Sequence, residues 1–238
     1  MPALSDLKIK IYADGADREG MLALYKNPNV QGFTTNPSLM AKAGVKDYRG
    51  FAKDILSVIK DRSISFEVFA DDLAEMERQA SEIKTWGSNV YVKIPITNTK
   101  GETCLPLVKK LTRDGVQLNI TALTTVEQVE ATVEVITGGA AAIVSVFAGR
   151  VADTGRCPLA LMKRSAEICN RAPNSELLWA STREVINIFQ AEECGCKIIT
   201  APHDIVKKLG GIGKDLNELS LDTVKGFSVD SIKAGFKL

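Results

Sequence analysis

The chain has 238 residues, of which 45% are hydrophobic and 25% are charged, as in ordinary folded globular proteins. This composition excludes a largely disordered chain and a collagen-like one. The 30 Lys and Arg residues nearly balance the 29 Asp and Glu residues, so the net charge is only +1. We therefore expect small-molecule partners, and neither nucleic acid nor a membrane surface.

The sequence predicts neither a membrane anchor nor an export signal. The longest run without a charged residue, Val135–Gly149, is shorter than the roughly 20 apolar residues that span a bilayer. The first ten residues hold no apolar core followed by a cleavage site. The five cysteines are an odd and scattered set, which is typical of reduced thiols. We therefore expect a cytoplasmic protein.

The pair Cys194 and Cys196 is the arrangement closest to a metal or redox site. Its spacing is not that of a C-x-x-C motif, and His203 is the only histidine, so a zinc site would lack ligands. We expect buried small residues here, no metal site and no cofactor.

Short runs rich in β-branched residues recur along the whole chain. Eight strands are predicted, at Lys8–Ala13, Gly32–Thr35, Ile64–Ala70, Asn89–Ile94, Val116–Thr121, Ala140–Phe147, Glu176–Ser181 and Cys196–Thr200. Apolar residues between them repeat at helical spacing, as in Tyr48, Phe51, Ile55 and Ile59, or Leu73, Met76, Ala80 and Ile83, or Leu105, Val108 and Leu111, or Val126, Val129, Val133 and Ile136.

Strands that alternate with helices indicate parallel strands joined by crossovers. About six strands would favour an open sheet, whereas eight units in this length favour a single closed (β/α)₈ barrel. Gly210–Gly213 is no dinucleotide fingerprint, because no strand leads into it. We expect one barrel domain over residues 1–238, with residues 216–238 as an extra C-terminal helix.

Catalytic side chains of such barrels lie at the carboxyl ends of the strands, which makes Lys93 the most informative residue. A lysine inside an apolar parallel strand either faces the barrel mouth or lies exposed at a sheet edge. Burial lowers the pKa of an amine, and a neutral amine forms a Schiff base with a carbonyl substrate. The residue pattern alone leaves both readings open.

The carboxylates and arginines at other strand ends also allow two interpretations each. Asp14 precedes a helical run and could cap that helix or act as an acid or base. Glu67 stands within a predicted strand, where a carboxylate is costly unless it is hydrogen-bonded. Arg150 and Arg183 could grip one phosphate, with Ser181 adding a hydroxyl, or could be solvated, with Ser181 as a helix cap.

Several segments together resemble the transaldolase family, in its short form that includes fructose-6-phosphate aldolases. They are Thr34–Ser38 (TTNPS), Val90–Pro95 (VYVKIP), Asn119–Thr121 (NIT) and Ser145–Arg150 (SVFAGR). The resemblance runs in order along nearly the whole chain, and the first two segments are specific in combination.

This resemblance implies a class I, metal-independent mechanism on sugar phosphates. Lys93 resembles the Schiff-base lysine, Asp14 the acid/base at the C4 hydroxyl, and Glu67 with Thr121 the pair that holds a catalytic water. The residues that resemble substrate contacts are Asn36, Asn119 and Ser145 for the dihydroxyacetone unit, Phe147 beside the imine, and Arg150, Ser181 and Arg183 for the phosphate.

Two residues favour a transaldolase over an aldolase within this family. The aldolase-type pattern has Gln where this chain has Glu67 and Tyr where it has Phe147. A Tyr hydroxyl could protonate the carbanion and release free dihydroxyacetone, whereas Phe donates no proton. Thr182 departs from the transaldolase pattern, which often has an apolar residue there. An aldolase that releases dihydroxyacetone, and a sugar-phosphate-binding protein without turnover, remain the alternatives.

The C-terminal segment carries apolar positions that need burial. They are Leu219, Val224, Phe227, Ile232 and Phe236. A helix with such a stripe packs on its own barrel or on a neighbouring subunit. The family resemblance favours the neighbour, and so predicts a homo-oligomer larger than a dimer.

Overall fold

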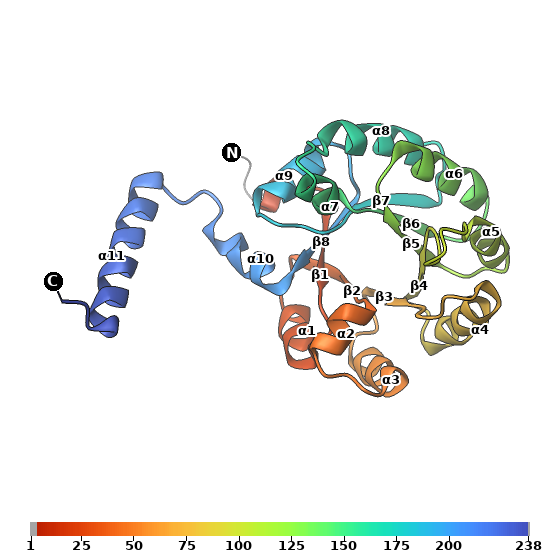
Figure 1. Cartoon of the computed structure of the whole chain (residues 1–238), viewed down its shortest axis with the longest axis horizontal. Helices are drawn as coiled ribbons and strands as arrows, with labels where there is room; N and C mark the ends of the chain where they lie inside the picture. Colours follow the sequence, from red (N-terminus) through yellow and green to blue (C-terminus); the bar gives the residue numbers. More distant parts are fainter. Residues whose placement is uncertain (1–3, 238) are drawn as a thin grey trace.

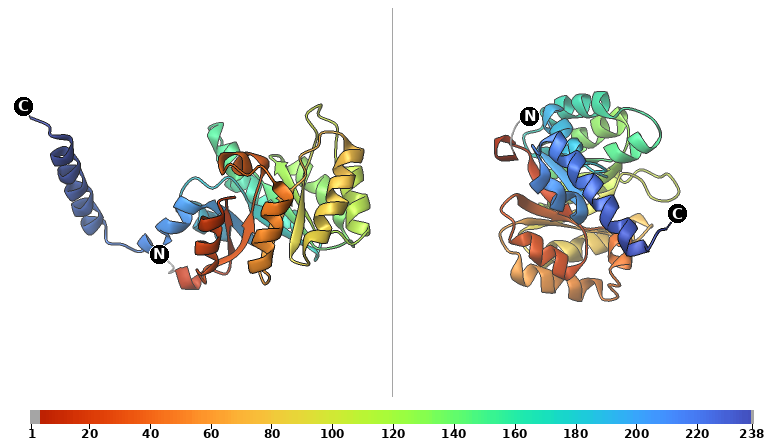
Figure 2. Two further views of the ribbon diagram at one scale, coloured as in Figure 1. Left: turned by 90° about the horizontal axis from the view of Figure 1, so that it is seen from below. Right: turned by 90° about the vertical axis from the view of Figure 1, so that its left-hand side faces the viewer.

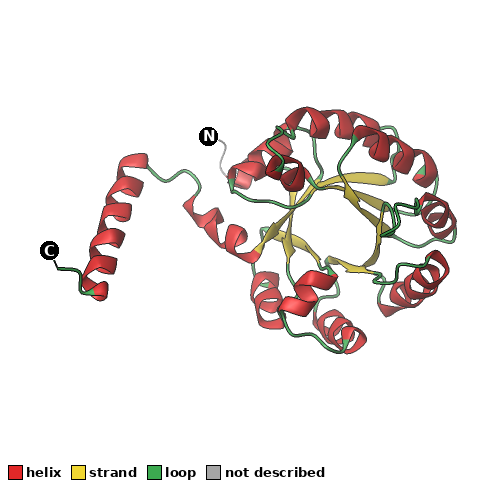
Figure 3. Cartoon of the chain, in the orientation of Figure 1, coloured by secondary structure: helices red, strands yellow, loops and turns green. Residues whose placement is uncertain are grey.

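The computed structural model describes residues 4–237, and it contains the predicted barrel. Eight parallel strands close into one ring in chain order, with β8 paired to β1, and helices surround this ring (Figures 1 and 3). The strands are β1 (Lys10–Asp14), β2 (Val30–Thr34), β3 (Ser63–Glu67), β4 (Val90–Pro95), β5 (Leu118–Leu123), β6 (Ala142–Val146), β7 (Ser175–Trp179) and β8 (Ile198–Pro202). All eight predicted strands are therefore present, with ends shifted by a few residues.

The helices follow the strands. They are α1 (Arg18–Tyr25), α2 (Pro37–Lys42), α3 (Tyr48–Val58), α4 (Leu73–Ile83), α5 (Leu105–Arg113), α6 (Val126–Ile136), α7 (Ala148–Asp153), α8 (Leu159–Cys169), α9 (Ile186–Glu193), α10 (His203–Lys207) and α11 (Leu216–Ala234). The four apolar spacings seen in the sequence coincide with α3, α4, α5 and α6.

The third strand is shorter than predicted. It ends at Glu67, because the backbone N–H groups of Phe69 and Ala70 donate to Oε1 of Gln79 on α4 at 2.9 and 3.1 Å. Glu67 is therefore the last residue of β3 and lies at the barrel mouth, not within the strand as the sequence suggested.

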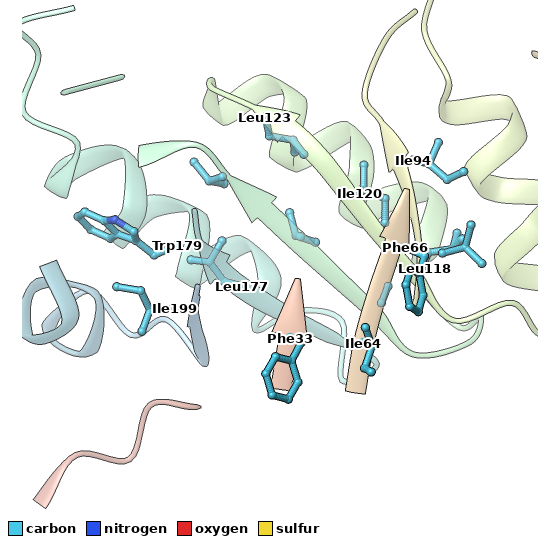
Figure 4. Packing of buried hydrophobic residues seen from close by; sticks show 14 of the residues in the cluster. Phe33, Ile64, Phe66, Ile94, Leu118, Ile120, Leu123, Leu177, Trp179 and Ile199 are labelled. Atoms are coloured by element: carbon cyan, nitrogen blue, oxygen red, sulfur yellow. The ribbon is translucent and has the colours of Figure 1, made fainter. Parts of the chain in front are cut away.

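Apolar side chains pack in two layers on either side of the strands. The larger layer fills the space between the strands and the helices, and includes Phe33, Phe66, Ile120 and Trp179 (Figure 4). A smaller cluster fills the barrel interior and consists of Tyr12, Ile143, Leu178, Ala180 and Ile198. Burial of both layers excludes water from the strands and supports the mouth of the barrel.

Cys194 and Cys196 are buried, as expected for small core residues, and all five thiols are free. Within residues 4–237, no three His, Cys, Asp or Glu side chains come together in a way that could hold a metal ion. In the same part of the chain, no helix combines the length and the apolar character needed to cross a membrane.

The C-terminal helix α11 stands away from the barrel, to which a short segment after α10 connects it (Figures 1 and 2). Its apolar side chains are therefore exposed, and Phe227 and Ile232 keep 71% and 75% of their surface. Phe236 lies just beyond the helix, whose left-handed cap is Gly235. The alternative in which this helix folds back on its own barrel is not what the structure shows.

Candidate active site

A cavity of about 420 Å³ opens where the strands end. Side chains alternate between the two faces of a strand, so every second residue points into the barrel. This alternation brings residues from all eight strands or the loops after them to one cavity. Its lining includes Asp14, Thr34, Asn36, Glu67, Lys93, Asn119, Thr121, Ser145, Phe147, Arg150, Ser181, Arg183 and Thr200. All eleven site residues expected from the sequence belong to this lining.

Lys93 lies on β4 with only 6% of its surface exposed. Its register partner on β3 is Glu67, whose Oε2 lies 3.2 Å from Lys93 Nζ, and Nζ also donates to the Thr35 carbonyl oxygen at 3.2 Å. An exposed lysine at a sheet edge is therefore excluded. The amine is held inside the cavity with one carboxylate beside it.

Asp14 is the last residue of β1 and does not cap a helix, because the cap of α1 is Asp17. Asp14 Oδ1 accepts a hydrogen bond from Thr34 Oγ1 at 2.7 Å. Burial raises the pKa of Asp14, and the Lys93 charge and the Thr34 hydrogen bond oppose that rise. This carboxyl group therefore takes up a proton more readily than an exposed aspartate.

The pKa of Glu67 is also raised. Burial raises the pKa of Glu67, and the neighbouring Lys93 ammonium opposes the rise. The backbone carbonyl of Glu67 accepts a hydrogen bond from the Tyr48 hydroxyl of α3 at 2.9 Å. Burial therefore raises the pKa of two carboxyl groups, Asp14 and Glu67, that line the same cavity as the Lys93 amine.

Thr121 reaches the cavity through an irregularity in β5. The β5–β6 register shifts between Ile120 and Leu123, and Ala122 takes a left-handed conformation with φ of 65°. Such a conformation costs a residue with a Cβ about 1–2 kcal/mol. The Thr121 hydroxyl oxygen is buried and has no hydrogen-bond partner among the described residues.

Two residues of the cavity lining, Asn119 and Ser145, belong to one row of hydrogen bonds. Ser145 Oγ donates to Asn119 Oδ1 at 2.6 Å, and Asn119 Nδ2 donates to Ser65 Oγ at 2.9 Å. Asn36, which also lines the cavity, caps α2 because its Oδ1 accepts a hydrogen bond from Leu39 N at 2.9 Å. These contacts fix the amide groups of Asn119 and Asn36 before any substrate binds.

Two arginines stand at the rim after β6 and β7. Arg150 lies on α7, and Arg183 pairs with Asp153 at the end of the same helix, with Nη2 2.7 Å from Asp153 Oδ2. Arg183 Nη1 also donates to the Ser181 carbonyl oxygen at 3.1 Å. Ser181 takes a φ of 62° and does not cap α9, whose cap is Val185.

Residues 11–237 match the protein family described as Transaldolase/Fructose-6-phosphate aldolase. The chain belongs to this transaldolase/aldolase family. A "Probable transaldolase" of Dehalococcoides mccartyi is 34% identical over 202 residues, which cover 84% of this chain and 90% of that protein. A "Probable transaldolase" of Sphingopyxis alaskensis is 31% identical over 228 residues, which cover 95% of this chain and 99% of that protein.

The similarity to distantly related solved structures is limited to the fold. A 3-hexulose-6-phosphate synthase of Salmonella typhimurium has a TM-score of 0.57 and 13% identity, over 84% of this chain and 91% of that one. The tryptophan synthase α-subunit of Pyrococcus furiosus has a TM-score of 0.58 and 13% identity, over 89% and 94% of the two chains. At such low identity, the common feature is the barrel.

Three hydroxyl residues that this member of the transaldolase/aldolase family places at the cavity, or against a residue of its lining, were not selected from the sequence. Thr34 and Thr200 are buried there, and Ser65 holds Asn119. Alternation along the strands was the available signal, because Thr34 neighbours Asp14 across β1 and β2 and Ser65 stands two residues before Glu67.

Proposed function

We propose that this enzyme is a transaldolase, which transfers a three-carbon dihydroxyacetone unit from a ketose phosphate to an aldose phosphate through a Schiff base on Lys93. The observation that carries the proposal is the buried Lys93 amine, 3.2 Å from the Glu67 carboxylate in the cavity that Asp14 also lines. Removing an amine and a carboxylate from water costs free energy, and such buried charged groups gather at active sites.

In the proposed reaction Lys93 first gives one proton to the neighbouring Glu67 carboxylate, and the resulting amine attacks the C2 carbonyl of the ketose with loss of water, which leaves an imine. Asp14 then accepts the proton of the C4 hydroxyl while the C3–C4 bond breaks. The aldehyde leaves, and the bonding electrons remain as an enamine on the lysine. The enamine carbon then adds to an acceptor aldehyde, whose oxygen takes the proton back from Asp14, and hydrolysis of the new imine completes the transfer.

Formation and hydrolysis of the imine both need a positioned water. The buried Thr121 hydroxyl and the Glu67 carboxyl line the same cavity, and the raised pKa of Glu67 suits a group that alternately gives and takes a proton. We assign this water to Glu67 and Thr121. Asn36, Asn119 and Ser145 would hold the hydroxyl groups of the dihydroxyacetone unit.

The phosphate group would bind at the rim of the cavity. Arg150 and Arg183 supply two guanidinium groups from α7 and from the loop after β7, and Ser181 adds a hydroxyl. Guanidinium groups form paired, charge-assisted hydrogen bonds with phosphate oxygens. We therefore infer that both donor and acceptor are phosphorylated sugars.

Transfer is favoured over release because Phe147 lines the cavity with a side chain that donates no proton. A product assay separates the two activities. With fructose 6-phosphate alone we expect little free dihydroxyacetone, and with erythrose 4-phosphate added we expect rapid formation of glyceraldehyde 3-phosphate and a seven-carbon ketose phosphate. Equal turnover with and without acceptor would instead establish the aldolase.

The variant Phe147→Tyr tests the reason for this preference. A Tyr hydroxyl in the cavity could protonate the enamine, so we expect the variant to release more free dihydroxyacetone than the parent enzyme. Phe189→Tyr on α9, outside the cavity lining, is the matched control.

Removal of metal ions is a separate test of the Schiff-base proposal. The transfer activity of the parent enzyme should be the same with and without EDTA, and activity that requires added zinc or manganese would contradict the proposal.

We also propose that the enzyme is a homo-oligomer in which α11 packs against a neighbouring subunit. The support is its exposed stripe of apolar side chains, which the barrel of the same chain does not cover. So many exposed apolar side chains on one helix in water would promote aggregation.

A further inference from the structure

Three side chains from three strands form a buried line that ends at Asp14. Thr200 on β8 lies with its Oγ1 2.5 Å from Thr34 Oγ1 on β2, and Thr34 Oγ1 lies 2.7 Å from Asp14 Oδ1 on β1. Only 5% of Thr200 and 3% of Thr34 are exposed. Both contacts have the length of ordinary O–H···O hydrogen bonds.

The direction of these hydrogen bonds follows from counting protons. A hydroxyl group carries one hydrogen, and an ionised carboxylate only accepts. The Thr34 hydrogen is directed to Asp14, so the hydrogen between the two threonines must come from Thr200. The line therefore runs one way, from Thr200 to Thr34 to Asp14.

The ends of this line are fixed by the barrel itself. Asp14 pairs in register with Thr34 on one side and with Pro202 on the other. The Thr200 carbonyl oxygen accepts a hydrogen bond from the Thr182 hydroxyl at 2.7 Å. Within residues 4–237, the hydrogen bond to the Asp14 side chain is at Oδ1, which leaves Oδ2 for a substrate hydroxyl.

We propose that Thr200 is a positioning residue for the acid/base reaction of Asp14, and that it acts through Thr34. The inference rests on the proposed function, which makes Asp14 the acid/base. A hydrogen bond that Thr34 receives from Thr200 polarises the bond that Thr34 donates, and so strengthens it in a buried setting. Thr200 thereby orients one carboxylate oxygen and favours the charged form that accepts the C4 hydroxyl proton.

Other charges act on the same carboxyl group and stay in place when the threonines are changed. Lys93 on β4 and His203 on α10 lower the pKa of Asp14, whereas the charge of Asp14 raises the pKa of Glu67 on β3. Burial lowers the pKa of His203, which also responds to Asp17, Asp204 and Lys207. A change that follows removal of a threonine hydroxyl is therefore assigned to the threonine line.

The experiment compares the pH profiles of kcat/KM for Thr200→Val, Thr34→Val and the double variant. Valine keeps the shape and removes the hydroxyl. Loss of a hydrogen bond to the carboxylate raises the Asp14 pKa, so the acid limb of the profile should move to higher pH. We expect kcat to fall roughly three- to tenfold for Thr200→Val and more for Thr34→Val, with a smaller change in KM.

The double variant carries the sharpest expectation. If Thr200 acts through Thr34, the double variant should match Thr34→Val alone in both kcat and acid limb. Thr200→Ser should restore the parent profile, because serine keeps the hydroxyl. Thr132→Val, which removes a buried hydroxyl on α6 outside the cavity, controls for the general cost of such a change.

Additive effects of the two threonine variants, or an acid limb that Thr200→Val leaves in place, would overturn the inference. Asp14→Asn tests the premise separately. Loss of turnover in Asp14→Asn together with an unmoved Thr200→Val profile would refute the threonine line and keep the acid/base role. Unchanged turnover in Asp14→Asn would refute both the threonine line and the acid/base role of Asp14. The Schiff base on Lys93 is tested independently, by borohydride labelling of that lysine.

Discussion

Arg183 at the rim of the cavity already has an acidic partner. Its guanidinium pairs with Asp153, and about half of each side chain is exposed, at 46% and 49%. Exposed ion pairs contribute roughly 0–1 kcal/mol, so a phosphate could replace Asp153 at little cost. We therefore propose that Asp153 orients Arg183 before the substrate arrives.

The arginine variants test the proposed phosphate site. Arg183→Ala and Arg150→Ala should raise KM for phosphorylated acceptors, because each removes a charge-assisted contact of about 1.5–3 kcal/mol. That corresponds to roughly a 10- to 150-fold increase in KM. The measurement compares KM for glyceraldehyde 3-phosphate with KM for unphosphorylated glyceraldehyde, which should change much less.

Arg164→Ala provides the control for these variants. Arg164 lies on α8 and pairs with Glu130 and Glu167, away from the cavity lining. We expect no change in either KM. Equal loss on phosphorylated and unphosphorylated acceptors in Arg183→Ala would indicate a role in folding instead of phosphate binding.

The contact between α7 and the end of β7 depends on a glycine. Gly149 N donates to the Ala180 carbonyl oxygen at 3.3 Å, and a Cβ at Gly149 would lie 1.7 Å from the Ser181 carbonyl oxygen. That oxygen belongs to the backbone, so it cannot rotate away as a side chain would. The close approach is what brings Arg150 and Arg183 to the same rim.

Gly149→Ala should therefore force these two elements apart. We expect a loss of about 1–3 kcal/mol in the free energy of unfolding, measured by denaturant titration, with weaker binding of phosphorylated substrates. Gly210→Ala is the matched control, since a Cβ there would meet no atom within 4 Å. Wild-type stability and KM in Gly149→Ala would refute this role of the close approach.

Local patterns in the sequence were enough to predict the strands and some of the helices of this barrel. Apolar spacing predicted α3, α4, α5 and α6, and β-branched runs predicted the eight strands. The end of β3 was missed because it depends on Gln79, whose side chain takes the next backbone N–H groups from a helix. No local pattern reports such a contact.

The candidate site could be predicted only partly, for a related reason. Lys93 and Glu67 were found because a charged residue in an apolar strand stands out against its neighbours. Thr34 and Thr200 are ordinary strand residues, and they meet although 166 positions separate them in the chain. Only closure of the barrel, which pairs β8 with β1, brings this line to Asp14.

At the scale of the whole molecule, α11 is the element that a single chain leaves uncovered. Leu216, Val224, Phe227 and Ile232 are each more than half exposed. Burial of such side chains contributes about 1.5–3 kcal/mol each, which favours contact with another copy. The helix begins at Leu216, and the Asp215 carboxylate caps its first turn.

We therefore expect a homo-oligomer larger than a dimer in light scattering at micromolar concentration. Truncation before Leu219, or the paired change Phe227→Ser and Ile232→Ser, should reduce the number of subunits, because both remove apolar contact area. Lys225→Ser, a change on the same helix outside the apolar set, should leave the assembly intact. A monodisperse monomer formed by the full chain would refute the proposed assembly.

Borohydride trapping at Lys93 tests the Schiff base most directly. The protein is incubated with fructose 6-phosphate, reduced with borohydride, digested and mapped by mass spectrometry. We expect the added mass of the dihydroxyacetone unit or of the whole sugar on the peptide that contains Lys93, and none on the Lys93→Ala variant. Lys10, which is paired with Glu176 in the same barrel, should remain unlabelled. A label on Lys10 or any other lysine, with Lys93 unmodified, would contradict the proposed mechanism.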